Sequence, residues 1–383
     1  MKHCMKAILL ATAVGWASGP LLAAGTHPTT GEALADDQIF TYVTGDEHTS
    51  VDPQIVEDTT GAAIVRDLFE GLYNQDADGN LVPGVALSHT TNADKTVYTF
   101  TLRDNAKWSD GKTVTAGDFE YAWKRLADPE TASPYQWFME VMNIKNAGGV
   151  MSGDMPVSEL GVKALNDTTL EVTLAGSMSY FPLTTTHGST FPSPQWVIEA
   201  HGTDWIKPEN IVSNGAYVLT KHVPNETLER ERNPMYWNDA ETIMEKVVIK
   251  IVNDENVALT RYLAGEFDKT GVPTGQFLKM QKQYPAEVYS NPKLCTYYYS
   301  LNMGENGPEA LKDKRVRQAL SYAIDRDIIV ENILQAGQFP AYTFTPGATA
   351  GFSVPEVAAA TMSQAERDAK AAELLSAAGY DKG

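Results

Sequence analysis

The side chains of this 383-residue chain that could perform chemistry are dispersed and lack the spacing of known catalytic motifs. Its later histidines stand at positions 27, 48, 89, 187, 201 and 222, and no two of them have the i, i+4 spacing of a zinc-protease helix. Gly111-Lys112-Thr113 lacks the upstream glycine of a phosphate loop, and Ser213-Asn214-Gly215 is typical of a turn rather than of a GxSxG nucleophile. The sequence therefore predicts no catalytic residue, no cofactor and no metal site.

The clearest structural element is the stretch from Thr96 to Leu126, which would position its neighbours. Residues 97–102 alternate in a pattern close to that of a half-buried strand, and turns follow at Asp104-Asn105 and Asp110-Gly111. Thr115 with Asp118 predicts a capping box that starts a helix. Its apolar face consists of Phe119, Ala122, Trp123 and Leu126.

Further strands and helices alternate along the chain, which indicates an α/β fold. Strands are predicted at 39–43, 170–174, 228–232, 247–252 and 295–301. Helices are predicted at 197–201, 257–263 and 277–284, and around an apolar face of Val316, Leu320, Ala323 and Ile324. Three more helices are predicted from their caps: one after Thr59 or Thr60, one after Asp325 or Asp327, and one after a Ser363–Glu366 capping box. Three prolines and Gly188 between Tyr180 and Pro194 should exclude regular structure, and we place a domain crossing there.

The net charge of the chain indicates which partners it can bind, and its first residues indicate the compartment in which the protein acts. The formal net charge of −19 argues against nucleic acid, because phosphate neutralisation requires clustered Lys and Arg. Lys2 and Lys6 precede the apolar run 7–14, which is too short to span a bilayer, and Leu22-Ala23-Ala24 offers small residues for cleavage. Residues 1–24 are therefore predicted to be a cleavable signal peptide, with the mature chain exported to a bacterial periplasm.

The order of short phrases along the chain resembles extracellular solute-binding proteins of family 5, above all periplasmic oligopeptide-binding proteins. The phrases are DLFEGLY, PGVA, LRDNAKWSDGKTVTAGDF, TASPY, LGVKALNDTTLEVTL, NIVSNGAY, YWNDAET, CTYYY and DRDIIV. The resemblance implies an α/β, two-lobed periplasmic binding protein fold of type II with an extra domain. It implies lobe I at 25–69 and 194–294, the extra domain at 70–193 and the start of lobe III at 295–383. It also suggests that the chain is truncated at its C-terminus, with apolar surface left uncovered there.

The same resemblance suggests four ligand-binding residues. Glu57 and Thr59, in DPQIVEDTTG, match cleft positions near the amino-terminal part of a peptide, with Thr59 acting mainly through its backbone. Tyr135 in SPY and Tyr298 in CTYYY match cleft tyrosines, and aromatic walls suit side chains of many shapes. The family's acidic partner of the peptide's α-amino group has no counterpart here, and a family lysine corresponds to Leu334.

Cys295 is the single cysteine after Cys4, which lies in the predicted signal peptide. One interpretation is a buried packing thiol beside Tyr297–Tyr299. The resemblance implies instead a disulfide candidate, because the corresponding cysteine of related proteins pairs with a later one. No later cysteine is present in this chain.

The resemblance implies a monomeric substrate-binding component of an ABC importer that captures oligopeptides and docks on membrane permease subunits. Alternatives within the family are binders of murein peptides, dipeptides or another small solute such as nickel complexes. A truncated remnant without ligand is a further alternative. From another class, an exported hydrolase would need a nucleophile or metal motif that the sequence does not display.

Overall fold

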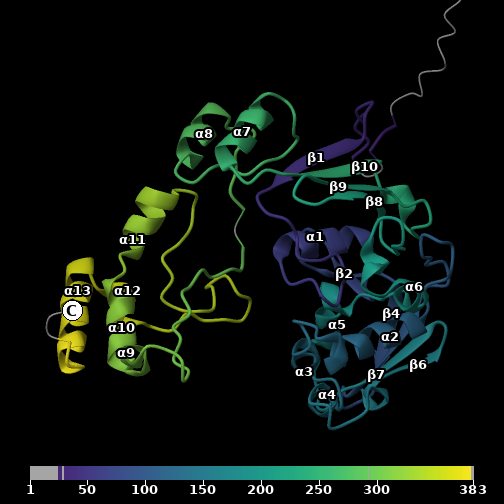
Figure 1. Cartoon of the computed structure of the whole chain (residues 1–383), viewed down its shortest axis with the longest axis horizontal. Coiled ribbons are helices and arrows are strands. Elements are labelled where there is room, and N and C mark those ends of the chain that lie inside the picture. The colour runs from purple at the N-terminus through teal and green to yellow at the C-terminus, as the bar shows by residue number, and fades with distance from the viewer. Residues whose placement is uncertain (1–24, 28–29, 292, 381–383) are drawn as a thin grey trace, which may run out of the picture. The chain divides into compact units, whose positions relative to one another are not determined.

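The computed structural model describes residues 25–27, 30–291 and 293–380 (Figure 1). The predicted signal peptide, residues 1–24, lies outside this range. The chain forms two compact units: the first extends to Asn253 and includes Phe267–Lys269, and the second comprises Asp254–Glu266 and Thr270 onwards. The division into lobe I, extra domain and lobe III stays a prediction. It assigned helices α7 (Glu255–Leu263) and α8 (Phe277–Gln283) to lobe I, whereas both group with the second unit.

The first sheet of the first unit has the strand order β1-β10-β9-β8. Its strands are β1 (Ile39–Thr44), β10 (Lys246–Ile251), β9 (Thr227–Arg232) and β8 (Tyr217–Val223). β1 pairs with β10 in parallel, whereas β10, β9 and β8 pair antiparallel. β-Branched residues fit this pleated surface, and Val247, Val248 and Ile249 of β10 are buried. The predicted strands at 39–43, 228–232 and 247–252 are therefore confirmed.

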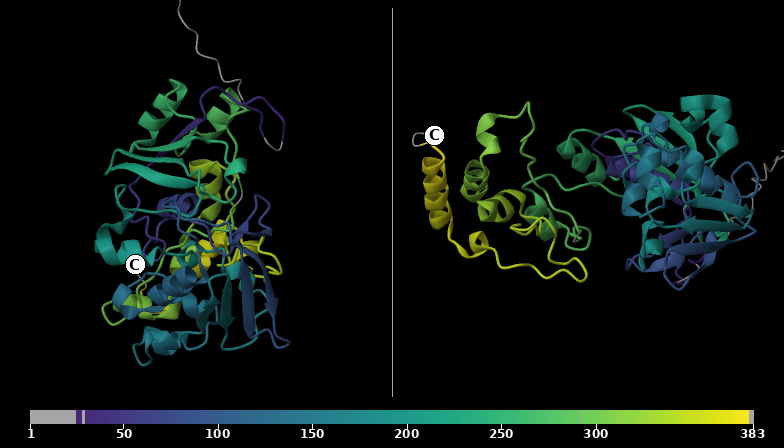
Figure 2. Two further views of the ribbon diagram at one scale, coloured as in Figure 1. Left: turned by 90° about the vertical axis from the view of Figure 1, so that its right-hand side faces the viewer. Right: turned by 90° about the horizontal axis from the view of Figure 1, so that it is seen from below.

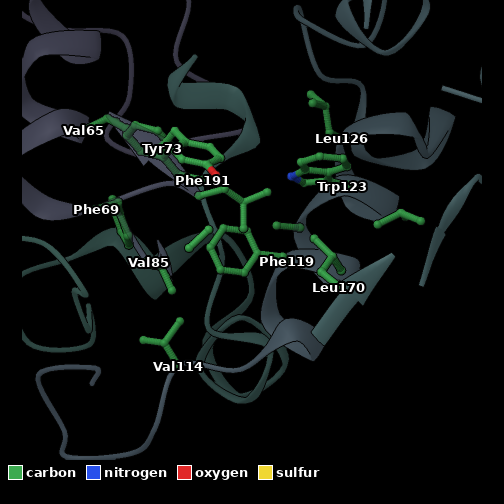
Figure 3. Packing of buried hydrophobic residues seen from close by; sticks show 14 of the residues in the cluster. Val65, Phe69, Tyr73, Val85, Val114, Phe119, Trp123, Leu126, Leu170 and Phe191 are labelled. Carbon is green, nitrogen blue, oxygen red and sulfur yellow. The ribbon is translucent and has the colours of Figure 1, made fainter. Parts of the chain in front are cut away.

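The second sheet of the first unit carries helix α2 (Ala116–Ala127) beside it (Figure 1). Its antiparallel strand order is β4-β5-β7-β6, namely Ala86–Thr91, Val97–Leu102, Thr169–Thr173 and Val162–Asn166. Phe119, Ala122, Trp123 and Leu126 are fully buried, as the helical spacing predicts, in the cluster shown in Figure 3. The Asp118 carboxylate accepts bonds from the N–H and hydroxyl of Thr115, at 2.8 and 3.2 Å, so the predicted capping box is confirmed.

Short elements complete the first unit. They are α1 (Thr59–Leu68), β2 (Tyr73–Gln75), β3 (Leu81–Pro83), η1 (Pro129–Thr131), α3 (Phe138–Val141), α4 (Ala147–Met151), η2 (Val157–Glu159), α5 (Phe181–Thr184), η3 (Gly188–Thr190), α6 (Gln195–His201), η4 (Gly202–Ile206) and η5 (Asp239–Glu241). The expectation of no regular element at 180–194 is wrong, because α5 and η3 form there. Pro182 is tolerated in the first turn of α5, where a missing N–H breaks no helical bond.

The second unit is helical in the part that the structure describes. Its elements are α7 (Glu255–Leu263), α8 (Phe277–Gln283), α9 (Glu309–Lys312), α10 (Lys314–Ala323), α11 (Arg326–Ile328), the π-helical η6 (Ile329–Leu334), α12 (Ala358–Thr361) and α13 (Gln364–Ala377). α10 and α13 lie side by side (Figures 1 and 2). Asp325 caps α11, and Ser363 with Glu366 forms the predicted capping box of α13.

Two expectations for the second unit are wrong. Residues 295–301 form no strand, since this stretch pairs with no other strand among the described residues and backbone pairing is what creates one. The predicted face of α10 is also incorrect: Val316 is buried together with Ala319, but Leu320 and Ile324 are exposed. α10 packs against α13, and Val316 with Ala319 forms its buried side.

The second unit leaves many large apolar side chains exposed, among them Tyr289, Leu294, Tyr297, Tyr299, Phe339, Phe344 and Val354. The expectation of uncovered apolar surface at the C-terminal end stays a prediction. None of the helices in the described residues combines the length and apolar character needed to cross a bilayer.

Candidate functional site

A pocket of about 220 Å³ opens on the first unit where three chain segments meet. The first is the start of α1 with the turn before it, the second contributes Tyr135, and the third is His187 to Ser189. The lining residues are Val56, Glu57, Asp58, Thr59, Ala62, Arg66, Tyr135, His187, Gly188 and Ser189. Three of the four predicted ligand-binding residues, Glu57, Thr59 and Tyr135, therefore share one pocket.

Asp58 sets the position of Glu57 and Thr59. It is the N-cap of α1, so the prediction that Thr59 or Thr60 caps this helix is wrong. Its carboxylate accepts bonds from the N–H of Gly61 at 2.7 Å and from the hydroxyl of Thr49 at 2.6 Å. An aspartate carboxylate suits this place because it also favours the positive end of the helix. Burial alone would raise the pKa of Asp58, but the bonds from Thr49 and Gly61 lower it below its usual value.

Gly61 lets the turn before α1 approach the helix closely. A Cβ atom at this position would lie 2.5 Å from Cγ2 of Val56 and 2.6 Å from the backbone oxygen of Ser50. Both distances are far below van der Waals contact, so a larger residue would displace the turn. The pocket edge formed by residues 56–59 thus depends on a glycine one turn into the helix.

Gln54 joins all three segments of the pocket. Its backbone oxygen accepts a 2.5 Å bond from the hydroxyl of Ser133, which in turn accepts a bond from the N–H of Tyr135 at 3.1 Å. Its side-chain amide donates to the backbone oxygens of Ser189 and Phe191, at 3.2 and 3.1 Å. Because Gln54 is fully buried, these bonds fix the relative positions of segments far apart in sequence.

A buried ion pair supports Gln54. Arg125 of α2 donates two bonds to the carboxylate of Asp52, at 2.7 and 2.6 Å, and a third to Oε1 of Gln54 at 2.8 Å. Trp205 donates to the same carboxylate at 3.0 Å. A bidentate pair with its remaining lone pairs satisfied has a defined geometry, so α2 holds the turn before α1 in place.

One wall of the pocket is aromatic. The ring of His187 lies 4.8 Å from the ring of Tyr135 and 4.5 Å from that of Phe138, centroid to centroid. Burial, and secondly the charge of Arg66, lowers the pKa of His187, which favours the neutral imidazole. Glu57 and Arg66 also line the pocket, and the guanidinium of Arg66 donates a 3.1 Å bond to the backbone oxygen of Thr186. The lining can therefore contact an apolar group and charges of both signs, and Nδ1 of His187 lies 2.8 Å from the hydroxyl oxygen of Ser189.

The fourth predicted residue, Tyr298, belongs to the second unit and is not among the residues lining this pocket. Its side chain is 58% exposed, and its ring packs edge-on against Phe344 at 5.0 Å. The nearby Cys295 is an exposed free thiol, so the interpretation as a buried packing residue is wrong. An extended, unpaired segment offers no core in which that thiol could be buried.

Comparisons with known proteins decide the family. The family model described as "Bacterial extracellular solute-binding proteins, family 5 Middle" matches residues 80–383. The chain belongs to this family. This family 5 protein is 44% identical over 352 residues to the periplasmic oligopeptide-binding protein OppA of Salmonella typhimurium, covering 91% of this chain and 64% of OppA. It is 42% identical over 381 residues to the periplasmic murein peptide-binding protein MppA of Escherichia coli, covering 99% of this chain and 70% of MppA.

Solved structures agree with this assignment. The structure of the E. coli murein tripeptide binding protein MppA superposes with a TM-score of 0.87 at 43% identity, covering 90% of this chain and 67% of that one. The predicted α/β, two-lobed periplasmic binding protein fold is thereby confirmed. The family 5 chain spans about two thirds of the length of the curated relatives it matches.

Arg66 and His187 are among the pocket residues that sequence reasoning missed. The sequence contained a signal for Arg66. Thr59, Ala62 and Arg66 stand at i, i+3 and i+7, so they share one face of a predicted helix. His187 gave no such signal, because it lies in a proline-rich segment 52 positions after Tyr135 and is brought to the pocket by tertiary bonds alone.

Proposed function

We propose that this chain is the peptide-capturing component of an ABC importer and that its pocket contacts part of a bound oligopeptide. The observation that supports this most is the meeting of Glu57, Thr59 and Tyr135 around one pocket in a protein 44% identical to an oligopeptide-binding protein. Tyr135 would supply apolar area to a side chain of the peptide. The carboxylate of Glu57 and the guanidinium of Arg66 would contact its polar or charged groups.

The remaining expectations follow from this proposal. The mature protein would act in the periplasm as a monomer after removal of residues 1–24, and it would dock on permease subunits. Tyr298 stays a predicted ligand-binding residue. The protein would not transform the peptide, because the family is one of binding proteins.

Calorimetry tests the proposal directly. Mixed tri- to pentapeptides are titrated into the signal-free protein, and each mixture is then inspected by mass spectrometry. We expect saturable heat and intact peptides. Absence of heat across the library would contradict peptide capture and favour the remnant without ligand, whereas cleaved peptides would favour the hydrolase.

A second candidate ligand is a murein peptide, since the 42% identity to the murein peptide-binding protein MppA extends over 99% of this chain. Competition separates the two candidates. A murein tripeptide that displaces bound oligopeptides at much lower concentration than ordinary tripeptides would assign the protein to murein peptides.

A further inference from the structure

A cluster of three potential metal ligands lies in the first unit, in a part of the chain that the proposed function does not use. Glu47 and His48 belong to the loop after β1, and His222 lies on β8. Oε1 of Glu47 is 2.6 Å from Nδ1 of His48 and 3.3 Å from Nε2 of His222. The two imidazole rings lie with their centroids 4.9 Å apart and their planes tilted by 43°. β1 and β8 are the two outer strands of their sheet, so the loop spans the sheet to bring these side chains together.

Two imidazole nitrogens and one carboxylate oxygen form a donor set that suits zinc and its neighbours among the divalent transition metals. In a tetrahedral zinc site with bonds of about 2.0–2.1 Å, ligand atoms lie roughly 3.3 Å from one another. Here one potential ligand atom from each residue lies within 4.8 Å of the other two. Small rotations of these side chains would therefore bring all three to coordination distance, and water would complete the shell.

The loop that carries two of the ligands is anchored on both sides. The backbone N–H of Asn225, in the β8–β9 hairpin, donates a 2.5 Å bond to Oε2 of Glu47. The amide of Asn253 donates to the backbone oxygen of Gly45 at 2.7 Å, and the N–H of Thr49 donates to Asp58 at 2.8 Å. Supporting bonds of this kind hold ligands near their productive geometry before a metal arrives.

The exposure of the three side chains is also compatible with a metal. The His48 side chain is 7% exposed, whereas those of Glu47 and His222 are 23% and 27% exposed, so an ion can enter from solvent.

We propose that Glu47, His48 and His222 form a binding site for one divalent transition-metal ion of the zinc class, which clamps the loop after β1 to strand β8. The alternative is a hydrogen-bonded cluster that merely shares protons. The two differ in a measurable way, because a cluster of that kind takes up no zinc. The site does not depend on the identity of the ligand in the pocket described above.

Untagged, signal-free protein stripped with a chelator is titrated with ZnCl₂ by calorimetry and with CoCl₂ by visible absorption. We expect one equivalent of zinc, a cobalt spectrum with tetrahedral d–d bands, and a higher melting temperature with zinc than with chelator. His48→Gln, His222→Gln and Glu47→Gln should each weaken zinc binding by at least about tenfold, the smallest loss typical even of outer-shell partners. His201→Gln, which removes an exposed imidazole on α6, is the matched control and should bind zinc unchanged.

Melting curves in chelator establish that each variant is folded before its zinc affinity is compared. Failure to bind zinc would overturn the proposal. So would binding that persists in all three variants, or that falls as much in His201→Gln, because adventitious surface histidines would then be responsible.

Discussion

The hydroxyl of Ser133 donates a 2.5 Å hydrogen bond to the backbone oxygen of Gln54, across 79 positions of sequence. This bond connects the segment that carries Tyr135 with the turn that carries Glu57. The Gln54 side chain then reaches the third pocket segment at Ser189. The pocket therefore depends on one buried glutamine rather than on a continuous element of secondary structure.

Replacing Gln54 should destabilise the first unit. Gln54→Leu would remove the partners of Arg125, Ser193 and two backbone oxygens in a fully buried place. Buried polar groups without partners cost about 1–3 kcal/mol each, so we expect the free energy of unfolding to fall by roughly 3 kcal/mol or more. Urea denaturation measures this free energy of unfolding.

The control is Gln195→Leu, at an exposed glutamine whose side chain bonds Glu199 on the same helix. It should change the free energy of unfolding by less than about 0.5 kcal/mol. Similar values for the two variants would refute the role given to Gln54.

Truncating Tyr135 should weaken peptide binding without unfolding the protein. Its ring is half-buried against His187, so Tyr135→Ala removes apolar contact area from the pocket wall. We expect a loss of roughly 1–3 kcal/mol in binding free energy, as for a truncated aromatic hot spot. Tyr135→Phe should retain most of the affinity if ring area dominates.

Calorimetry with the peptide bound best by the parent protein measures the loss. Tyr180→Ala is the control, since Tyr180 is 60% exposed and is not among the residues that line the pocket. Equal affinity in Tyr135→Ala and the parent protein would remove Tyr135 from the site.

Sequence patterns predicted the elements that are determined by residues close together in the sequence. The α2 cap at Thr115 and Asp118 and its buried face follow from spacing within a dozen residues. The cap of α1 was assigned one or two positions too late, because Asp58 and two threonines are all suitable caps and only the bond from Gly61 distinguishes them. Residues 295–301 have a strand's composition, yet a strand also requires a partner, which composition does not specify.

Features made by distant residues were beyond sequence reasoning. Glu47 and His222 meet across 175 positions, so a search for spaced histidines found no cluster. The bonds of Gln54 to Ser189 are equally remote. The family resemblance gave Glu57, Thr59 and Tyr135 because it carries tertiary information that periodicity lacks.

Chymotrypsin should first cut the chain in the exposed irregular stretches of the second unit, of which Tyr297–Tyr299 is one. This stretch has no helix or strand, and its tyrosines are exposed. Segments with few backbone bonds open at little cost in free energy and meet proteases first. Brief digestion followed by mass spectrometry should give fragments that end in such stretches. Tyr98, buried in β5, serves as the internal control and should be cut only after global unfolding. Initial cleavage within the sheet of β5 would contradict this order.

Acid should destabilise the first unit partly through His187. Burial and the charge of Arg66 lower the pKa of this imidazole in the folded protein. Below the unfolded value of about 6.5, the unfolded chain therefore binds a proton that the folded chain does not. The contribution of His187 to the free energy of unfolding is complete above pH 6.5. It declines as pH falls from there towards the folded pKa, by at most about 1.4 kcal/mol per pH unit.

Urea denaturation in chelator at pH 7.5, 6.5 and 5.5 measures this pH dependence. His187→Asn retains an acceptor for the N–H of Ser189 but cannot titrate, so its stability should fall less over this range. His201→Gln, at an exposed site, should keep the parent's dependence, and a parallel curve for His187→Asn would exclude His187 as a source of the acid sensitivity.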